Sequence, residues 1–416
     1  MGKYAIIDKP EWRWWVTPVP LKNSPVHRWY YFPHSFTADL VHALIDEWGL
    51  GDGDRILDPF SGAGTTLVAA KQKGIAATAY DISPFAVLVS SVKAANFSVE
   101  RLKTTWTELQ SIIDPHRWNG SSRVYPQLVR GALPGKLLGA FDAIWRSVEE
   151  VGCSHVEKQF FRLAVLKSIR TFSRLVPTGG WLSWSDNRAN TRSVMSTLAG
   201  HIQEMIEDVT NHPLPRKGGY HAYVADARRL PDKDATYSAV ITSPPYPNRH
   251  DYTRVFGVEL MFGFLNWSQT RSLRYQCFES HPEAHPKRPK STEYTIPPSL
   301  LKTAGRLEKS GLEPRIIRML KGYFLDTYLC LKETQRVCLS GAHLGFVVGN
   351  AQYSGQRIPV DELTAEIGEQ VGLRCERIVA VRERGNSAQQ MGRFGRNPSR
   401  ESVVVFVKPR RRTRKS

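Results

Sequence analysis

An apolar segment that runs into a glycine-rich turn is the feature that most restricts the fold of this chain. Residues 54–66 read Asp-Arg-Ile-Leu-Asp-Pro-Phe-Ser-Gly-Ala-Gly-Thr-Thr, and the apolar run Leu-Val-Ala-Ala follows directly at 67–70. This order predicts a strand at 54–58, a tight turn and then the start of a helix. Glycines in such a turn let the backbone approach a ligand closely, and the first turn of the helix adds free N–H groups. The segment therefore predicts a ligand site at the end of a strand.

An acidic residue follows at the spacing that nucleotide-binding βαβ units use. A second strand is predicted at 76–80, and it ends in Asp81, which lies 17 positions after Gly64. In dinucleotide-binding folds, the acid that binds the ribose hydroxyls lies about 20 residues beyond the glycine-rich turn. The turn alone is a weak signal, but the turn and the acid in this order indicate a nucleotide-binding α/β unit.

Five further strands are predicted, which makes seven. They lie at 221–225, 238–242, 343–349, 375–382 and 402–407. Helical patterns between them, the first of them at 37–48, give the alternation that is typical of an α/β domain. The segment 11–36 is rich in aromatic residues and proline, and we expect it to wrap the outside of the ligand site.

The sequence Thr-Ser-Pro-Pro-Tyr at 242–246 follows the apolar run 237–241 and predicts a site for a planar amine. Both prolines have a fixed φ and no N–H group, and Pro245 forces Pro244 into an extended conformation, so the carbonyls are held in place with few internal donors. The Ser243 hydroxyl and the Pro244 carbonyl can accept hydrogen bonds from an exocyclic amine, and Tyr246 can stack on the ring that carries it. A Pro-Pro turn that merely ends a strand is the alternative.

With both blocks in view, the chain resembles the S-adenosylmethionine-dependent amino-methyltransferases of DNA, in particular the cytosine-N4 group. In that family the Asp-Pro-Phe-Ser-Gly-Ala-Gly block at 58–64 corresponds to the cofactor loop, and Thr-Ser-Pro-Pro-Tyr corresponds to the catalytic loop. The resemblance implies a Rossmann-like methyltransferase sheet of seven strands in which the last strand runs antiparallel to the others. Further family-like stretches lie at 23–36, 251–254, 384–390 and 401–407.

The resemblance also implies roles for individual residues. Asp81 would hold the ribose hydroxyls of S-adenosylmethionine, and Asp226 would lie beside the adenine amine. The residues predicted to bind the cofactor are Phe36, Asp58, Pro59, Phe60, Gly62, Gly64, Thr65, Asp81, Ile82, Asp226 and Ala227, and those predicted to be catalytic are Ser243, Pro244, Pro245 and Tyr246. For Asp226, a helix cap after a strand is a second and compatible interpretation.

The function that the resemblance implies is methylation of the N4 amine of a cytosine flipped out of duplex DNA, within a restriction-modification system that includes a cognate endonuclease. Ser at position 243, rather than Asp or Asn, favours cytosine. Adenine-N6 methylation and methylation of a base amine in RNA stay open, and so does a nucleic-acid-binding module with a vestigial cofactor pocket. No strong general base is evident, and Asp251 is a weak candidate for the proton acceptor.

Composition agrees with a polyanionic partner such as double-stranded DNA. Lys and Arg exceed Asp and Glu by 18 residues, and phosphate contacts by these cations release counterions. The five cysteines are scattered without a Cys-x-x-Cys pair, so no metal site is predicted, and none follows a proline, which argues against the Pro-Cys nucleophile of cytosine-C5 methyltransferases. No run of about 18 apolar residues occurs, so we expect a cytoplasmic protein that neither inserts into a membrane nor is exported.

Four parts are predicted along the chain. Residues 1–96 hold an N-terminal segment and the first half of the methyltransferase domain, 97–219 a helical insertion, 220–408 the second half, and 409–416 a basic, disordered tail. The clearest helix of the insertion is predicted at 155–175, where Val156, Phe160, Leu163, Ala164, Ile169 and Phe172 recur at helical spacing.

Three regions compete for recognition of the target sequence. They are the insertion at 97–219, the segment 253–312, which includes a basic loop at 281–299 that is expected to be mobile, and the Gly- and Arg-rich segment 382–400, which could reach a groove edge or the flipped base. The sequence does not choose between them, and it does not indicate an oligomeric state.

Overall fold

The computed structural model describes residues 3–114, 118, 120–178, 180–185, 193–247, 250–288, 293–385, 392, 395 and 398–410. Its centre is an eight-stranded sheet in the order β1-β11-β12-β8-β7-β2-β3-β6. The strands are β1 (Ile6–Asp8), β2 (Arg55–Asp58), β3 (Ala76–Asp81), β6 (Tyr220–Val224), β7 (Tyr237–Thr242), β8 (Cys338–Gly349), β11 (Arg374–Arg384) and β12 (Ser399–Val407). Two small hairpins lie outside this sheet, β4 (Leu175–Thr178) with β5 (Trp181–Trp184) and β9 (Ala351–Tyr353) with β10 (Gln356–Ile358).

Strand directions confirm the α/β methyltransferase sheet. The strands β6, β3, β2, β7 and β8 are parallel to one another, whereas β12 is antiparallel to both of its neighbours, β8 and β11. All seven predicted strands are present, and the last one has the predicted antiparallel orientation. The eighth strand, β1, pairs in parallel with β11 at the edge of the sheet and was not predicted. This strand has only three residues, and all three are exposed, so its sequence shows no alternation of apolar and polar side chains from which a strand could be predicted.

Fourteen helices and three 3-10 turns, η1 (Pro10–Trp14), η2 (Val19–Lys22) and η3 (His27–Trp29), lie in the described part of the chain. The helices of the first half are α1 (Ala38–Glu47), α2 (Thr65–Gln72), α3 (Pro84–Ala94), α4 (Val99–Ile112), α5 (Gln127–Ala132), α6 (Lys136–Glu150), α7 (His155–Phe172) and α8 (Val194–Asn211). Those of the second half are α9 (Tyr252–Val255), α10 (Gly257–Gly263), α11 (Trp267–Gln276), α12 (Pro298–Lys309), α13 (Pro314–Val337) and α14 (Val360–Gln370).

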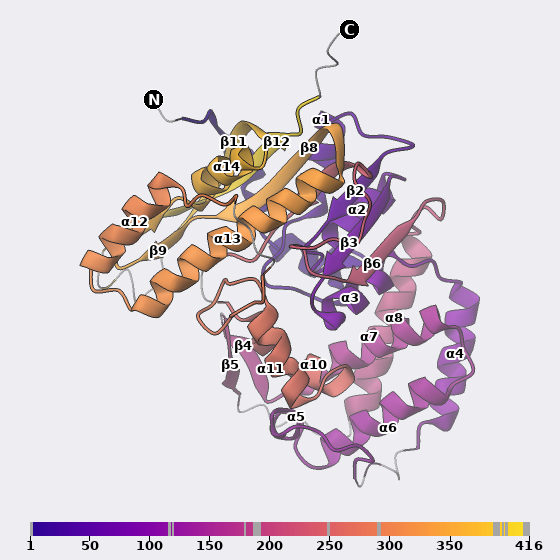
Figure 1. The fold of residues 1–416 in the computed structure, drawn as a ribbon. Coiled ribbons are helices and arrows are strands. Elements are labelled where there is room, and N and C mark those ends of the chain that lie inside the picture. The colour runs from indigo at the N-terminus through magenta and orange to yellow at the C-terminus, as the bar shows by residue number, and fades with distance from the viewer. Residues whose placement is uncertain are drawn as a thin grey trace.

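The sheet is covered on both faces, because successive strand residues point to opposite sides. Ile56, Ala239 and Val403 pack with α1 and α2, while their neighbours Leu57, Val240 and Val404 pack with α12, α13 and α14. Figure 1 shows the long α13 lying across the sheet with α14 beside it. No helix in the described residues is both long and apolar enough to cross a membrane.

Between β3 and β6 the chain forms a helical layer, α4 to α8, with the β4–β5 hairpin (Figure 1). Helix α7 begins at His155 because Ser154 and Glu157 form a capping box. Five of the six residues predicted to form its apolar stripe are buried, but Val156 is exposed. The helix ends at Phe172 and not at the predicted Leu175, which is the first residue of β4. The boundaries 97 and 219 of the insertion stay a prediction, as does its role in target recognition.

Candidate active site

The turn after β2 has the backbone geometry that its glycines predict. Gly62 and Gly64 have φ of 47° and 76°, a region that favours glycine, and α2 begins at Thr65. A Cβ atom on Gly64 would lie 2.8 Å from Cα of Ser90 in α3. The turn is held from outside, since the Ser61 N–H donates to the Tyr80 carbonyl at 2.8 Å and the Ser61 and Ser90 hydroxyls are 2.6 Å apart. Only glycine fits position 64 without displacing the backbone of α3.

We therefore expect Gly64→Ala to distort the turn and weaken ligand binding there by about 10-fold or more, because strain and clash together cost about 1–3 kcal/mol. Gly49→Ala is the matched control: Gly49 also has a positive φ, 62°, but no atom lies within 4 Å of the position that its Cβ would take. Calorimetric titration of both variants with S-adenosylmethionine measures the difference. Equal affinities would show that the shape of this turn is unimportant for binding.

Asp81 joins the end of β3 to the turn. Its Oδ2 accepts the Gly62 N–H and its Oδ1 accepts the Ser83 N–H, both at 2.9 Å, while burial raises the pKa of this carboxyl. A carboxylate oxygen has two lone pairs, so each oxygen can still accept a hydroxyl of a bound ligand. The geometry thus fixes an acceptor beside the turn.

Asp58, in contrast, faces the interior. It is 3% exposed, and its Oδ1 accepts the Thr242 hydroxyl at 2.6 Å and the Phe60 N–H at 3.0 Å. Burial raises the pKa of Asp58 to about 6. Because Thr242 ends β7, this carboxyl ties the turn after β2 to the loop that holds Ser243.

A cavity of about 1000 Å³, its open mouth included, lies against the turn. Seven of the residues predicted to bind the cofactor line it: Pro59, Phe60, Gly62, Asp81, Ile82, Asp226 and Ala227. Asp58, Gly64 and Thr65 are not among its lining residues, and Phe36 lines a second cavity instead.

The wall of this first cavity also includes residues that the sequence analysis did not single out, among them Phe32, His34, Ser83, Arg228, Cys277 and Phe278. Phe32 and His34 belong to the aromatic N-terminal segment, which lines the cavity as well as wrapping it. The ring centroids of Phe278 and Phe60 are 5.6 Å apart, and the two rings make an edge-to-face contact. Aromatic walls with carboxylates at the rim suit a planar, hydroxylated ligand such as the adenosyl group.

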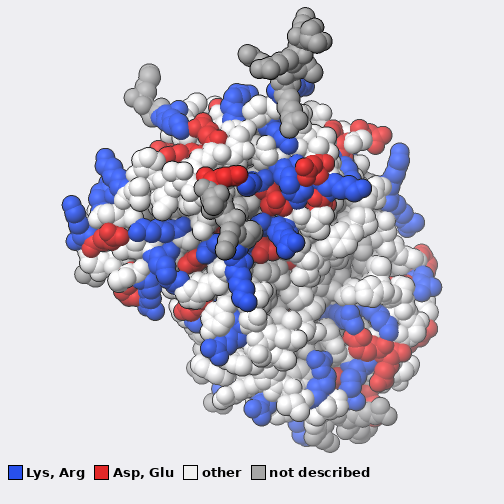
Figure 2. Space-filling model, in the orientation of Figure 1, with Lys and Arg blue, Asp and Glu red and all other residues white. Residues whose placement is uncertain are grey.

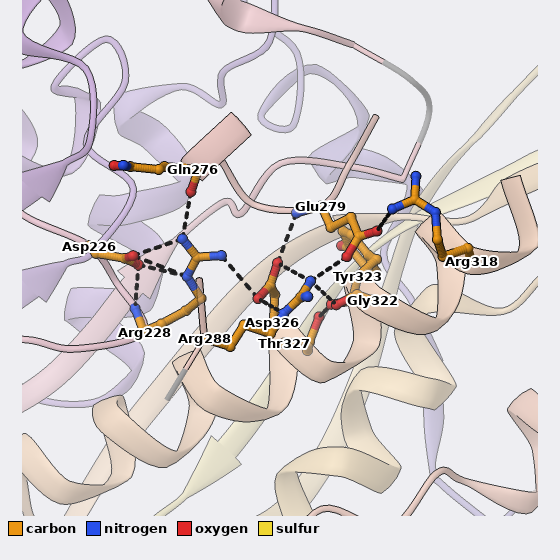
Figure 3. Close-up of polar contacts among 10 residues, drawn as sticks. All are labelled: Asp226, Arg228, Gln276, Glu279, Arg288, Arg318, Gly322, Tyr323, Asp326 and Thr327. Carbon is orange, nitrogen blue, oxygen red and sulfur yellow. Dashed lines mark hydrogen bonds and ion pairs between the residues drawn. The ribbon is translucent and has the colours of Figure 1, made fainter. Parts of the chain in front are cut away.

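A chain of buried charges holds Asp226 at the rim (Figure 3). Its carboxylate accepts Arg228 Nη2 at 2.7 Å, Arg228 Nε at 2.9 Å and the Arg228 backbone N–H at 2.9 Å. Arg228 in turn donates Nη1 to Asp326 of α13 at 3.0 Å. The helix-cap interpretation of Asp226 is wrong, because a turn that pairs it with Arg229 follows β6.

The same chain of charges anchors the segment after α11. Arg288 donates Nε to Asp326 Oδ1 at 2.8 Å and also pairs with Glu279 (Figure 3). The prediction of a mobile basic loop at 281–299 is therefore wrong for Arg288, which is docked on α13. Residues 289–292 of that loop lie outside the described residues.

The loop Ser243–Tyr246 separates the first cavity from the second. Ser243 lines both cavities, Pro245 lines the first, and Pro244 and Tyr246 line the second. The Ser243 hydroxyl donates to the Val347 carbonyl at 3.2 Å, and the Tyr353 hydroxyl donates to the Pro247 carbonyl at 2.6 Å. Because the Ser243 proton is given to β8, its oxygen lone pairs are left to accept from another donor.

The second cavity holds about 680 Å³, its mouth included, and is bounded by the N-terminal segment on one side and by sheet residues on the other. Its lining includes Val16, Tyr31, Phe36, Tyr252, Val347, Arg382 and Glu401. The Tyr246 ring lies against Gly349 at the end of β8, where an added Cβ would be 2.8 Å from a ring carbon. Gly349 leaves the space that the ring occupies.

Gly349→Ala is therefore expected to displace the Tyr246 ring, and we expect methyl transfer to fall by about 100-fold, the cost of misplacing a positioning group by about 1 Å. Binding of S-adenosylmethionine, in the other cavity, is expected to stay unchanged. Gly305→Ala in α12 is the control, since nothing lies within 4 Å of its Cβ position. Radiolabelled methyl transfer to DNA checks this, and equal rates for the two variants would contradict it.

Asp251 does not act as a free carboxylate. It caps α9, where its Oδ1 accepts the Thr253 N–H at 2.9 Å, and its Oδ2 lies 2.7 Å from Arg274 Nε and 3.2 Å from Arg254 Nε. Both carboxylate oxygens are therefore engaged by the N-terminus of α9 and by two arginines. Positions 248 and 249, between the Ser243–Tyr246 loop and α9, lie outside the described residues.

Comparison with known proteins agrees with this arrangement. Residues 8–91 match a family described as DNA methylase. The type II methyltransferase M.BsoBI of Geobacillus stearothermophilus is 29% identical over 450 residues, which cover 93% of this chain and 86% of that protein. The type II methyltransferase M.AvaI of Nostoc sp. is 29% identical over 425 residues, which cover 93% of this chain and 87% of that protein. Over most of its length the chain is thus similar to type II methyltransferases.

The first cavity fits S-adenosylmethionine, the cofactor that the resemblance implies. The aromatic walls suit an adenine ring, and Asp81 offers acceptors for ribose hydroxyls. A solved S-adenosylmethionine-dependent methyltransferase from Methanosarcina mazei superimposes with a TM-score of 0.31 and 9% identity, over 88% of this chain and 97% of that one. That superposition is too poor to support an argument, so the fold rests on the strand order given above.

Proposed function

We propose that this protein is a methyltransferase that transfers a methyl group from S-adenosylmethionine to the N4 amine of a cytosine within a specific sequence of duplex DNA. In this proposal it is the modification enzyme of a restriction-modification system, with a cognate endonuclease as its partner. One observation carries the proposal: Ser243 lies in the partition between two cavities, one of which has the walls that an adenosyl group requires. The second cavity is then the place for the target base.

The target base must leave the duplex to reach this cavity, which costs a few kcal/mol of stacking and pairing. Tyr246 stacks on the extruded ring, and the Ser243 oxygen and the Pro244 carbonyl accept hydrogen bonds from its amine. These contacts help to free the nitrogen lone pair, which is otherwise delocalised into the ring. Because Ser243 gives its own proton to Val347, it can only accept from the amine.

The cofactor supplies an electrophilic methyl group on a sulfonium centre. The loop holds the amine nitrogen in line with that methyl, so positioning accounts for most of the rate. As the nitrogen gained the methyl group, the methyl–sulfur bond would break and its electron pair would stay on sulfur, which becomes a neutral thioether. The nitrogen would then be cationic and acidic and would give up a proton to water. This scheme needs no general base, which agrees with the engagement of Asp251 by two arginines.

In this proposal Asp81 holds the ribose hydroxyls and Asp226 accepts from the adenine amine. Asp226 is suited to that role because Arg228 fixes the orientation of its carboxylate while 39% of its side-chain surface stays exposed. The net charge of +18 favours the DNA backbone. Figure 2 shows Lys and Arg on both the sheet half and the helical half of the face in view, interspersed with acidic side chains.

Mass spectrometry of nucleosides tests the proposal. Plasmid DNA from a methyltransferase-deficient host is incubated with the protein and S-adenosylmethionine, digested and analysed. N4-methylcytosine is the expected product. N6-methyladenine, or transfer to transfer RNA or ribosomal RNA with none to DNA, would replace the proposed substrate, and a failure to bind S-adenosylmethionine in calorimetric titration would point to a binding module instead.

A further inference from the structure

Three neighbouring strands place Gly349, Glu401 and Arg382 in one row across the sheet. Glu401 of β12 pairs with Gly349 of β8 on one side and with Arg382 of β11 on the other. The ladder between β11 and β12 shifts register between Ala380 and Arg382. Such a bulge turns the side chains that follow it, and bulges are frequent next to active sites for this reason. The row ends under the Tyr246 ring, which lies against Gly349.

An ion pair at this row forms part of the second cavity. Arg382 donates Nε to Glu401, and both side chains line the cavity together with Ser243, Pro244 and Tyr246. Glu401 is 3% exposed and Arg382 is 26% exposed. A guanidinium has five N–H groups and stays charged, so the pair leaves it capacity to donate to a ligand. The cavity therefore combines acceptors on the catalytic loop with a charged donor on the sheet.

This combination matches one edge of cytosine. Along that edge cytosine presents its amine, the ring nitrogen N3 and the carbonyl oxygen O2, in this order. Adenine presents its amine and the ring nitrogen N1, and then a carbon that carries hydrogen. When the amine is held by Ser243 and Pro244, the third position distinguishes the two bases. A donor there gains a hydrogen bond from cytosine and loses its partner with adenine.

We propose that Arg382, oriented by Glu401, donates a hydrogen bond to O2 of the flipped cytosine and so selects cytosine over adenine. The inference rests on the proposed function, in which the second cavity receives the target base. Glu401 compensates the charge of the guanidinium in a partly buried place and fixes the direction of its fork. Arg382 is then a specificity-determining residue that touches the substrate.

The test uses a double variant, Arg382→Met with Glu401→Gln, so that no carboxylate is left unpaired. The matched control is Arg377→Met with Glu47→Gln, which removes an ion pair from the same strand, β11, outside both cavities. The methylated sequence is first read by long-read sequencing of plasmid DNA treated with the wild-type protein. A synthetic duplex of that sequence then serves as substrate.

A second duplex carries a 2-aminopyridine nucleoside in place of the target cytosine. This base keeps the amine and the adjacent ring nitrogen and lacks the carbonyl. The wild-type protein and the control variant are expected to lose roughly 10- to 100-fold in kcat/KM on this duplex. On the cytosine duplex, the kcat/KM of the Arg382 variant is expected to be lower than that of the wild-type protein by the same factor. The variant is therefore expected to have similar kcat/KM values on the two duplexes. Its affinity for S-adenosylmethionine is expected to stay within about 2-fold.

The outcomes separate the two proposals. If the Arg382 variant still discriminates between the two duplexes as strongly as the wild-type protein, the inference is wrong. Equal losses of kcat/KM on both duplexes are one form of this outcome, and they would mean that the ion pair is structural. If instead the wild-type protein forms N6-methyladenine on plasmid DNA, the proposed function fails, and the assignment of Arg382 to a cytosine carbonyl fails with it.

Discussion

Replacement of Tyr246 by alanine is expected to reduce methyl transfer to DNA by about 1000-fold, while the affinity for S-adenosylmethionine stays within about 2-fold of wild type. The ring packs on Gly349 and forms a wall of the second cavity, whereas Ser243 lines both cavities. Stacking of a base on an aromatic ring contributes about 1–3 kcal/mol. Loss of the ring also lets the amine leave its position in line with the methyl group, which costs about 100-fold more.

Tyr246→Phe is the matched control, because it keeps the ring and removes the hydroxyl. We expect it to retain most of the wild-type rate if the ring is what holds the base. The measurement is radiolabelled methyl transfer in single-turnover conditions, together with calorimetric titration of S-adenosylmethionine. Wild-type activity in the alanine variant would remove Tyr246 from the site. Equal loss in both variants would assign the effect to the hydroxyl.

The sheet could be predicted because most of its strands are buried on both faces. Residues such as Ile56 and Leu57, or Val403 and Val404, face two different helical layers, so the strands appear in the sequence as continuous apolar runs. The edge strand β1 could not be predicted, since it has only three exposed residues and is held by backbone pairing with β11. The apolar stripe of α7 was predicted from spacing alone. Val156, in the first turn of the helix and four residues before Phe160, is exposed, whereas the other five residues of the stripe are buried.

The residues around the first cavity could be picked out from the sequence because each part is a contiguous motif. The turn 58–64, Asp81 and the loop 242–246 each follow a strand, and parallel strands bring their carboxyl ends to one edge of the sheet. The second cavity draws on distant parts of the chain. Arg382 and Glu401 meet across two strands, so no local pattern marks them as partners, although the segment 382–400 was one candidate for contact with the base. The rest of that segment lies mostly outside the described residues.

The network of ion pairs that connects Asp226 with Arg228, Asp326 and Arg288 could not be predicted at all. Asp226 and Arg228 are two residues apart, but Asp326 lies in the middle of α13 and Arg288 in the loop before α12. A single Asp in a helix of 24 residues carries no sign of burial. Only the packing of α13 on the sheet brings these charges together, and Asp326 is then fully buried between two guanidinium groups (Figure 3).

Asp326→Asn is accordingly expected to lower the free energy of unfolding by about 3–5 kcal/mol, the usual cost of removing one partner from a buried ion network. The carboxylate accepts Arg228 Nη1 at 3.0 Å, Arg288 Nε at 2.8 Å and the Glu279 N–H at 2.9 Å. An amide has one oxygen to accept with, and its NH2 group would face donors. The two arginines would keep their full charge with less to compensate it, because a guanidinium does not lose its proton.

The control is Glu308→Gln, the same chemical change in an exposed pair, since Glu308 lies 3.5 Å from Lys321 at the surface. We expect a change of about 0.5 kcal/mol or less there. Urea denaturation followed by fluorescence measures both variants. The Asp326 variant should also bind S-adenosylmethionine more weakly, because Arg228 pairs both with the buried Asp326 and with Asp226 at the rim of the first cavity. A stable variant with unchanged affinity would mean that the charged chain neither supports the fold nor orients Asp226.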